Sequence, residues 1–338
     1  MLCTSRSKRA FTVMSSTPPL ISIVIVNYNG IKWLKNCLDS LYKQNYTNYE
    51  IILVDNCSSD GSCEFVKSSY PDVKLLRLDK NYGFAKANNI ALKYTKGEYL
   101  LFLNNDTIVQ DGWLERLVKA ALENPEYKIL ASVQLPDQEG GKTRDLMVYF
   151  DASLYSPESG TEKNIVDSAF ASGACFLIHK DWLKEVGYLF DEFYFMAAED
   201  LDLSLRTLFA GGKIGYVMDS KLIHFVGGSS IRYRSKINRL ATRNQVLTAY
   251  KLFRNKYFIK ILIAKLMHIF VRTFVKAYDL KNNFSMLLGY LESLGILMKY
   301  REHKLYITKM KKLSDADVIK NFKYKSHAQR LLYKFLIG

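Results

Sequence analysis

The chain has 338 residues, of which 49% are hydrophobic, so it is long enough to bury one large core or two smaller ones. This composition excludes an intrinsically disordered protein. The formal net charge of +15 is unevenly distributed. Residues 231–338 hold 24 Lys and Arg against 5 Asp and Glu, a net +19, whereas residues 1–230 hold 24 against 28, a net −4. We therefore expect the last third of the chain to form a separate functional layer.

The N-terminal segment and the cysteines indicate a cytosolic location. The apolar run Ala10–Met14 is too short for a secretory signal. Pro18 and Pro19 mark the end of a tail over residues 1–19, which we expect to be disordered, and Met14 is an alternative start. The five cysteines are scattered, odd in number and form no Cys-x-x-Cys pair. That pattern favours a reducing compartment and no structural zinc.

The first 110 residues repeat one pattern, in which a strand ends in a polar turn and leads into a helix. The strands are expected at Ile21–Val26, Ile51–Val54, Val73–Leu78 and Leu100–Leu103. Four such units predict a parallel, right-handed, doubly wound half-domain. Its ligand crevice is expected above the carboxyl ends of the strands.

The last of these strands carries the most informative polar residues. Leu100–Leu103 is fully apolar and stops abruptly at Asn104, Asn105 and Asp106. Polar residues at the carboxyl end of a buried parallel strand fall in the ligand crevice. Asp106 is therefore placed to hold a cation or a phosphate-bearing substrate.

A second acidic cluster precedes a predicted helix. The spacing of Leu201, Leu205 and Leu208 places Glu199 and Asp200 in the first turn of that helix. Acids at a helix N-terminus are favoured by the helix dipole alone, so the spacing leaves a structural role open. Asp202 stands four residues before Arg206, a spacing that predicts an ordinary surface pair.

The basic C-terminal third contains two apolar stretches. Between residues 256 and 278, His268 and the cations Lys265, Arg272 and Lys276 form a narrow stripe on one helical face; Phe284–Met298 is broken only by Glu292. One interpretation is a helical bundle packed on the first domain. The favoured one is a pair of interfacial helices on an anionic membrane, with Lys and Arg reaching the headgroups.

Neither a transmembrane helix nor a nucleic-acid partner is expected in this region. No stretch of 18 uncharged apolar residues predicts a transmembrane helix. A helix-turn-helix, RNA-recognition or zinc-finger signature is also absent, so no nucleic-acid partner is expected.

Six segments together closely resemble family 2 inverting glycosyltransferases of the GT-A fold, especially the rhamnosyltransferase-like branch. The segments are Ile23–Gly30, Val54–Ser62, Asn81–Ala85, Leu103–Thr107, Ser172–Ala174 and Glu199–Asp202. The resemblance covers about residues 20–230. It implies an α/β fold of the GT-A type, Rossmann-like with a mostly parallel central sheet, followed by a basic helical extension.

The resemblance also implies which residues bind the donor nucleotide. These are Tyr28, Asp55, Asn81, Gly83, Lys86 and Asn105. Asp55 fits because a carboxylate can accept the imide hydrogen of uracil or thymine. Structural alternatives remain open: Asp55 as a helix cap, Tyr28 as a core aromatic and Lys86 as a solvated helix residue.

Metal binding is implied at the end of the fourth strand. Asn104-Asn105-Asp106 occupies the place of the family's Asp-x-Asp motif but keeps only the last carboxylate. One carboxylate with diphosphate oxygens can hold Mg²⁺ or Mn²⁺, the expected cofactor. His224 matches a position where relatives offer an imidazole, although a hydrogen-bonded core histidine is the alternative.

Asp200 matches the family's catalytic base. An acceptor hydroxyl must lose its proton as it attacks the anomeric carbon opposite the leaving nucleotide diphosphate, which inverts the anomeric centre without a covalent nucleophile. Gly173, Asp191 and Glu199 are expected at the acceptor, with Gly173 inside an apolar strand where it allows close approach or forms a bulge.

We therefore expect a metal-assisted glycosyltransferase domain at residues 20–230 and a basic, helical, membrane-associating extension at residues 231–338. Its partners would be a nucleotide-diphosphate sugar, a glycan or lipid-linked saccharide acceptor and the anionic cytoplasmic face of the cell membrane, where the protein is peripheral. The donor site is expected to be complete without the extension. The alternative is an enzyme acting on a soluble glycan or protein, with the extension serving oligomerisation. A dehydrogenase is disfavoured because the first strand lacks a Gly-x-Gly-x-x-Gly turn.

Overall fold

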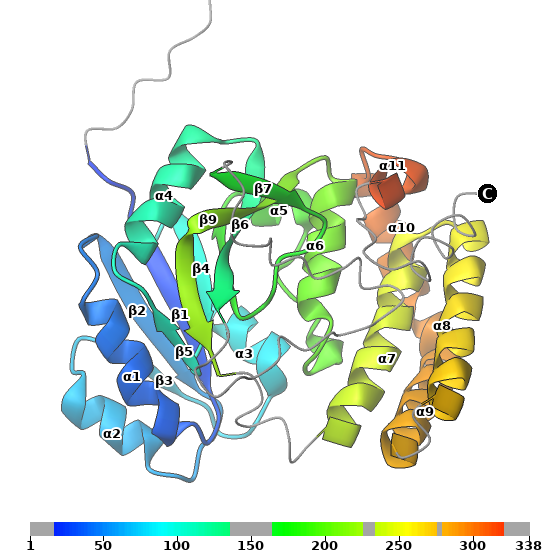
Figure 1. Ribbon diagram of the computed structural model, residues 1–338, viewed down its shortest axis with the longest axis horizontal. Helices are drawn as coiled ribbons and strands as arrows, with labels where there is room; N and C mark the ends of the chain where they lie inside the picture. Colours follow the sequence, from blue (N-terminus) through cyan, green and yellow to red (C-terminus); the bar gives the residue numbers. More distant parts are fainter. Residues whose placement is uncertain (1–16, 136–163, 226–233, 276–278, 321–338) are drawn as a thin grey trace, which may run out of the picture.

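The computed structural model describes residues 17–135, 164–225, 234–275 and 279–320. Figure 1 shows a curled sheet with helices on both faces and a group of C-terminal helices to one side. Most of the expected tail at residues 1–19 and the expected domain boundary at residue 230 lie outside the described residues, so both stay predictions.

The N-terminal half is the predicted parallel, doubly wound unit. Its strands are β1 (Ile21–Asn27), β2 (Tyr49–Asp55), β3 (Lys74–Arg77) and β4 (Tyr99–Asn104). They are parallel and lie in the order β3-β2-β1-β4. The connecting helices are α1 (Ile31–Tyr42), α2 (Ser62–Ser69) and α3 (Gly83–Ala91), and a short 3₁₀ turn η1 (Leu92–Tyr94) follows α3. The expected α/β fold class is confirmed.

The second half of the sheet is mixed. Its strands are β5 (Thr107–Val109), β6 (Tyr127–Leu135), β7 (Ile165–Ser168), β8 (Cys175–His179) and β9 (Lys213–His224), and its helices are α4 (Trp113–Glu123), α5 (Trp182–Val186), η2 (Glu192–Tyr194) and α6 (Glu199–Phe209). Strand β8 runs antiparallel to both β4 and β6. Gly173 lies in the turn before β8, which corrects its predicted place inside a strand.

Two apolar layers fill the space on either side of the sheet. Side chains of successive strand residues point to opposite faces, so Val24 of β1 belongs to one layer and Ile23 and Ile25 to the other. Helices α1, α2 and α4 cover the second layer, and α3 and α6 cover the first.

The C-terminal helices share the core of the first domain. They are α7 (Arg234–Leu252), α8 (Asn255–Val275), α9 (Leu280–Ile296), η5 (Leu297–Tyr300), α10 (Arg301–Met310) and α11 (Asp315–Lys320). Val246 and Leu252 of α7 are buried in the same cluster as Leu205 of α6. None of the helices in the described part of the chain combines the length and the apolar character that crossing a membrane requires.

The polar stripe of α8 faces the protein interior, which corrects the prediction that its cations reach headgroups. Lys265 and His268 are buried, and the Arg272 side chain is mostly covered. The hydrogen-bonding partners of Lys265 and Arg272 are Gln245, Asp279 and Asn283. Buried polar groups need such partners, and these lie on or beside α7 and α9. Lys276 is outside the described residues.

The outward faces of α8 and α9 are mostly apolar. Every exposed residue between Ile259 and Phe274 is apolar. We call the surface formed by Ile263, Met267, Phe270, Phe274, Phe284 and Leu291 the apolar face. Its phenyl groups are 61–69% exposed. A surface helix of a globular protein normally turns its polar side outward, so this helix pair has the reverse polarity.

Candidate functional site

The carboxyl ends of β1, β2 and β4 carry a network of amides and one acid. Asn27 pairs in register with Asp55. The Asn27 amide nitrogen donates to Asp55 Oδ1 and to Ser58 Oγ, both at 3.1 Å, and its carbonyl oxygen accepts from Asn105 Nδ2 at 2.7 Å. Asp55 Oδ2 also accepts from the backbone N–H of Ser58 at 2.9 Å. The sheet therefore brings the predicted donor residues Asp55 and Asn105 together around Asn27.

Asn81 and Gly83 lie beside this network. The amide of Asn56, the residue after Asp55, donates to Asn81 Oδ1 at 3.0 Å, and the same oxygen accepts from the Gly83 N–H at 2.9 Å. Gly83 begins α3 with φ +81°, and a Cβ there would lie 2.4 Å from the Phe195 carbonyl oxygen. Only glycine fits this position without a backbone shift.

Tyr28 is exposed to solvent and Lys86 partly so. Tyr28 follows β1 and is 40% exposed. Lys86 Nζ lies 3.1 Å from Glu192 Oε2 and 5.2 Å from the ring centroid of Tyr82. Lys86 therefore has an acidic partner in the protein, and its contact with a nucleotide stays a prediction.

The side chains of Asp106 and His224 face each other. His224 Nε2 lies 3.2 Å from Asp106 Oδ1 and 3.4 Å from Asn104 Nδ2. On the other side of the ring, Nδ1 lies 3.1 Å from Gln134 Oε1. With the amide placed this way, Nδ1 donates its hydrogen to Gln134, so Nε2 of a neutral ring presents its lone pair toward Asp106. A carboxylate oxygen and an imidazole nitrogen in this arrangement fit a shared cation.

Asp106 and His224 are the two ionisable side chains that the described residues bring to the candidate metal site. Across the ranges that the structure describes, no group of three or more His, Cys, Asp and Glu side chains is arranged to hold a metal ion. Any further ligands would be amides, water or substrate oxygens, which hard divalent cations accept readily.

Asp200 lies in the first turn of α6, and backbone groups hold its carboxylate. Oδ2 accepts from the Gly173 N–H at 2.9 Å, and Oδ1 accepts from the Leu201 N–H at 2.8 Å. A Cβ at position 173 would lie only 3.2 Å from Oδ2, so glycine leaves room for the carboxylate. The carbonyl of the next residue, Ala174, accepts from the Asn104 N–H at 2.9 Å. Asp200 and the polar end of β4 therefore meet at one edge of the sheet.

Glu199 adds a second carboxyl beside Asp200. It is buried, and its Oε2 has no hydrogen-bond partner among the described residues. Burial raises the pKa of Glu199, and the charge of the neighbouring Asp200 raises it further, to about 8. Burial also raises the pKa of Asp200, although the backbone donors oppose this change. Raised pKa values make both carboxyls better proton acceptors when ionised.

Asp202 and Arg206 form a buried ion pair, which corrects the prediction of a surface pair. Both side chains are 0% exposed, and Arg206 Nε lies 2.8 Å from Asp202 Oδ2. The guanidinium also donates to the carbonyls of Val186, Tyr188 and Leu189. Two residues that are four positions apart lie on the same face of a helix, whether that face is buried or exposed. The spacing therefore could not show that this pair faces the core.

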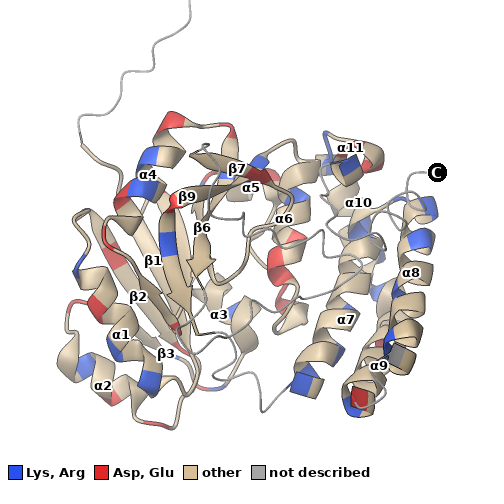
Figure 2. Cartoon of the chain, viewed as in Figure 1, with Lys and Arg blue, Asp and Glu red and all other residues tan. Residues whose placement is uncertain are grey.

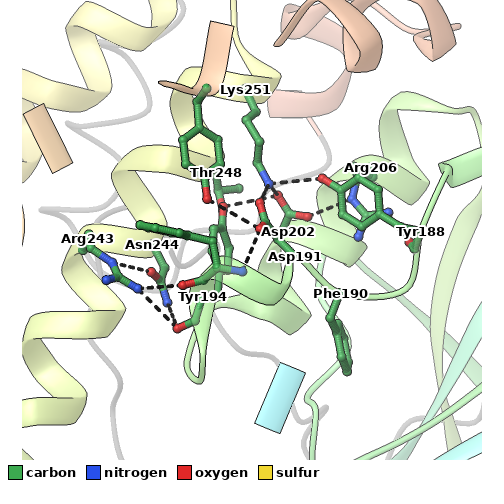
Figure 3. Close-up of polar contacts among 12 residues, drawn as sticks. Tyr188, Phe190, Asp191, Tyr194, Asp202, Arg206, Arg243, Asn244, Thr248 and Lys251 are labelled. Carbon is green, nitrogen blue, oxygen red and sulfur yellow. Dashed lines mark hydrogen bonds and ion pairs between the residues drawn. The ribbon is translucent and has the colours of Figure 1, made fainter. Parts of the chain in front are cut away.

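Lys251 of α7 completes this cluster (Figure 3). Its Nζ lies 2.7 Å from Asp202 Oδ1 and 2.8 Å from Asp191 Oδ2, and all three side chains are buried. With Arg206, the cluster holds two carboxylates and two cations. The carboxylate of Asp191, a predicted acceptor ligand, is thus bound within the protein.

Among the residues of these networks that the sequence prediction of the site did not include are Asn27, Gln134 and Lys251. Asn27 and Gln134 lie at or near the ends of largely apolar strands, the same signal that indicated Asp106. Lys251 is 60 residues from Asp191 and is one cation among many in its region, so no local pattern indicated it.

Residues 22–187 match the sequence profile of Glycosyl transferase family 2. Glycosyltransferase GlyG of Streptococcus pneumoniae is 33% identical over 125 residues, which cover 36% of this chain and 42% of GlyG. The chain spans between 31% and 62% of the length of the first curated relatives that it matches.

Solved structures agree with the fold. The structure of S. aureus TarS in complex with UDP-GlcNAc superposes with a TM-score of 0.56 at 18% identity, over 89% of each chain. Mannosyltransferase PcManGT from Pyrobaculum calidifontis, in complex with GDP-Man and Mn²⁺, gives 0.54 at 16% identity, over 82% of this chain and 88% of its own. The chain therefore has the GT-A fold, and its residues 22–187 are similar to glycosyl transferase family 2 domains.

Proposed function

We propose that this chain transfers a sugar from a nucleotide-diphosphate donor to an acceptor hydroxyl, with inversion at the anomeric carbon. The observation that carries the proposal is the junction of Asp200 with the end of β4, through Gly173 and Ala174. It places a carboxylate with a raised pKa beside the strand ends where open α/β sheets bind ligands.

Asp200 is the proposed base. The Gly173 N–H donates to Asp200 Oδ2 and so fixes that carboxylate oxygen. The second lone pair of Oδ2 remains to accept the proton of an attacking hydroxyl. A base on the side opposite the leaving group suits a single displacement, which inverts the anomeric centre. The buried Glu199 carboxyl is proposed to bind an acceptor hydroxyl, because its Oε2 has no hydrogen-bond partner among the described residues.

The donor nucleotide is proposed to bind at the ends of β1 and β2. The Asp55 carboxylate accepts hydrogen bonds from Asn27, Ser58 and Cys63, and it is proposed to accept a further one from a base imide or a ribose hydroxyl. Structures with the same fold hold UDP-GlcNAc and GDP-Man, which supports a nucleotide sugar as the donor class. The sugar, including the rhamnose suggested by the sequence, stays a prediction.

Asp106, His224 and Asn104 are proposed to hold Mg²⁺ or Mn²⁺ together with the donor diphosphate. The Mn²⁺ complex of PcManGT supports this choice of cation. A divalent cation there would stabilise the negative charge that develops on the leaving diphosphate. The protein's part is to hold the His224 ring through Gln134 and to present the Asp106 carboxylate toward it.

Asp106→Asn is expected to weaken Mn²⁺-dependent binding of the nucleoside diphosphate by at least tenfold, about 1.4 kcal/mol. The substitution keeps the side-chain volume but removes the charge that faces His224. UDP and GDP binding would be measured by thermal shift with Mn²⁺ and with chelator. Asp219→Asn, at an exposed carboxylate, is the matched control. Equal Mn²⁺ dependence in all three proteins would contradict the metal assignment.

The experiment that tests the function is an assay of nucleoside diphosphate release. The full chain would be incubated with a panel of nucleotide sugars, Mn²⁺, and membrane extracts or soluble glycans as acceptors. Acceptor-dependent release with an inverted product supports the proposal, and retention of configuration or no release with any donor contradicts it.

We propose further that the apolar face lies on an anionic membrane, at the cytoplasmic side of the cell membrane, where a lipid-linked saccharide or cell-surface glycan precursor is the acceptor. The polar stripe of α8 is satisfied inside the protein, so the outward face of both helices is left apolar. Between residues 254 and 301, the exposed charged side chains that the structure describes are all cations: Arg254, Lys256, Lys281, Lys299 and Arg301. Figure 2 shows Lys and Arg at both ends of the helix pair.

Charge favours a membrane over a second copy of the chain as the occupant of this face. Two copies would bring two cationic rims together, whereas anionic headgroups are attracted to one rim by about 1 kcal/mol per cation. The two acids within these helices and their connection, Asp279 and Glu292, are already paired with arginines.

Phe270→Ser combined with Phe274→Ser is expected to weaken binding to anionic vesicles by at least tenfold. These rings are 63% and 69% exposed, and each buried aromatic contributes about 2 kcal/mol of transfer free energy. Sedimentation with vesicles containing phosphatidylserine measures the effect at two salt concentrations. Leu122→Ser, which removes an exposed apolar group of α4, is the control. Unchanged vesicle binding, or a dimer that the double variant dissociates, would contradict the membrane assignment.

A further inference from the structure

The segment between Tyr194 and α6 has an unusual backbone conformation. Phe195, Ala197 and Ala198 have φ angles of 62°, 70° and 66°, in the left-handed region that residues with a Cβ avoid. An alanine side chain has no polar group that could offset the cost by a local hydrogen bond. Contacts from elsewhere in the fold must therefore hold loop 195–198 in place.

One buried side chain of α7, that of Asn244, makes several of these contacts (Figure 3). Asn244 Nδ2 donates to the carbonyl oxygens of Tyr194 at 3.0 Å, Met196 at 3.1 Å and Ala197 at 2.7 Å. Its Oδ1 accepts from Arg243 Nε at 3.0 Å. A guanidinium can only donate, so this bond fixes the orientation of the amide and aims the nitrogen at the loop.

Loop 195–198 connects the two halves of the candidate site. The Phe195 carbonyl accepts from the Ala85 N–H of α3 at 3.1 Å, beside the predicted donor residue Gly83. At its other end, Ala198 is the N-cap of α6, two residues before Asp200. A shift of the loop would therefore move the carboxylate relative to the donor segment.

We propose that Asn244 is a positioning residue, which holds loop 195–198 in its left-handed conformation so that Asp200 is aligned with the bound donor. The inference rests on the proposed function. It makes α7 a part of the catalytic apparatus, although Asn244 touches neither donor nor acceptor.

Asn244→Ala is expected to lower kcat for transfer at least tenfold, with the Kd of the nucleoside diphosphate changed less than twofold. Asn282→Ala is the matched control, because Asn282 is also a buried amide of a C-terminal helix but bonds to Ser235 and Asp279. We expect this control to keep kcat within twofold. Similar kcat losses in both variants, or none in Asn244→Ala, would overturn the inference.

A second substitution separates positioning from loss of folding. Glycine adopts positive φ without cost, so Ala197→Gly in the Asn244→Ala background is expected to recover at least a third of the lost kcat. Hydrogen exchange should rise at residues 194–199 in Asn244→Ala and return toward wild type in the double variant. Unchanged exchange in that segment would overturn the inference. If the unmodified chain transfers no sugar, the proposed function fails, and the exchange experiment still decides whether Asn244 holds the loop.

Discussion

Asp200→Asn is expected to lower kcat for sugar transfer by about 10²–10⁴-fold while nucleotide affinity stays close to that of the unmodified chain. An asparagine has nearly the same volume, and its one carbonyl oxygen can still accept from the Gly173 N–H, so the variant loses only the bond from the Leu201 N–H and is expected to fold. It cannot take the proton of the attacking hydroxyl. Release of nucleoside diphosphate measures kcat, and thermal shift with the nucleotide measures binding.

Glu199→Gln is the matched control, one residue away in the same turn of α6. We expect it to raise KM for the acceptor more than it lowers kcat, because Glu199 is proposed to bind and not to accept the proton. If this variant loses transfer while Asp200→Asn keeps it, the base is Glu199 and the assignment is wrong.

The pH dependence follows from the direction of the pKa changes. Burial raises the pKa of Asp200, and only the ionised carboxylate can act as a base, so kcat should rise with pH as this proton is lost. The raised pKa of Glu199 also affects the pH dependence of stability. Its pKa rises from 4.5 to about 8 on folding, so between these values the unfolded state is ionised while the folded state keeps its proton. Stability therefore falls with rising pH in this window, and Glu199→Gln should remove that part of the fall.

The parallel half of the fold could be predicted because its signals are local. Each strand ends in polar residues within the same short segment, and the chain returns to the sheet through a helix each time. Because parallel strands end at one edge, Asp55, Asn105 and Asp106 could be placed together from the sequence alone. Asp200 needed the resemblance, since its position at a helix N-terminus has an ordinary structural explanation.

The contacts of the C-terminal helices could not be predicted because they depend on distant partners. The stripe of Lys265, His268 and Arg272 was recognised, but its direction depends on Gln245 and Asn283 in neighbouring helices. The burial of Asp202 and Arg206 could not be predicted either, because residues four apart have the same spacing in a buried pair and in an exposed pair. The expectation that the donor site is complete without the extension stays a prediction, and the contacts of Lys251 with Asp191 and Asp202 show only that the extension packs into the acidic cluster beside α6.

Lys251→Met is expected to lower the free energy of unfolding by about 3–5 kcal/mol, a larger effect than any surface substitution in this chain should have. The cation lies 2.7 Å and 2.8 Å from two buried carboxylates, Asp202 and Asp191. Methionine fills most of the space of the lysine side chain. It removes the cation that offsets the free-energy cost of burying the two carboxylates. Denaturation by urea, followed by circular dichroism, measures the change.

The role of the charge can be separated from that of the shape. Lys119→Met, at an exposed lysine of α4, is the control and should change stability by less than about 0.5 kcal/mol. Adding Asp191→Asn to Lys251→Met removes one uncompensated charge and should restore part of the loss.

Burial alone would raise the pKa of Asp202, but Lys251 and Arg206 outweigh this and lower it. A group with a lowered pKa stabilises the fold above its unfolded pKa and loses that contribution as the pH falls, so the destabilisation by Lys251→Met should shrink toward acid pH. A loss that is independent of pH and of Asp191→Asn would show that Lys251 acts through packing and not through its charge.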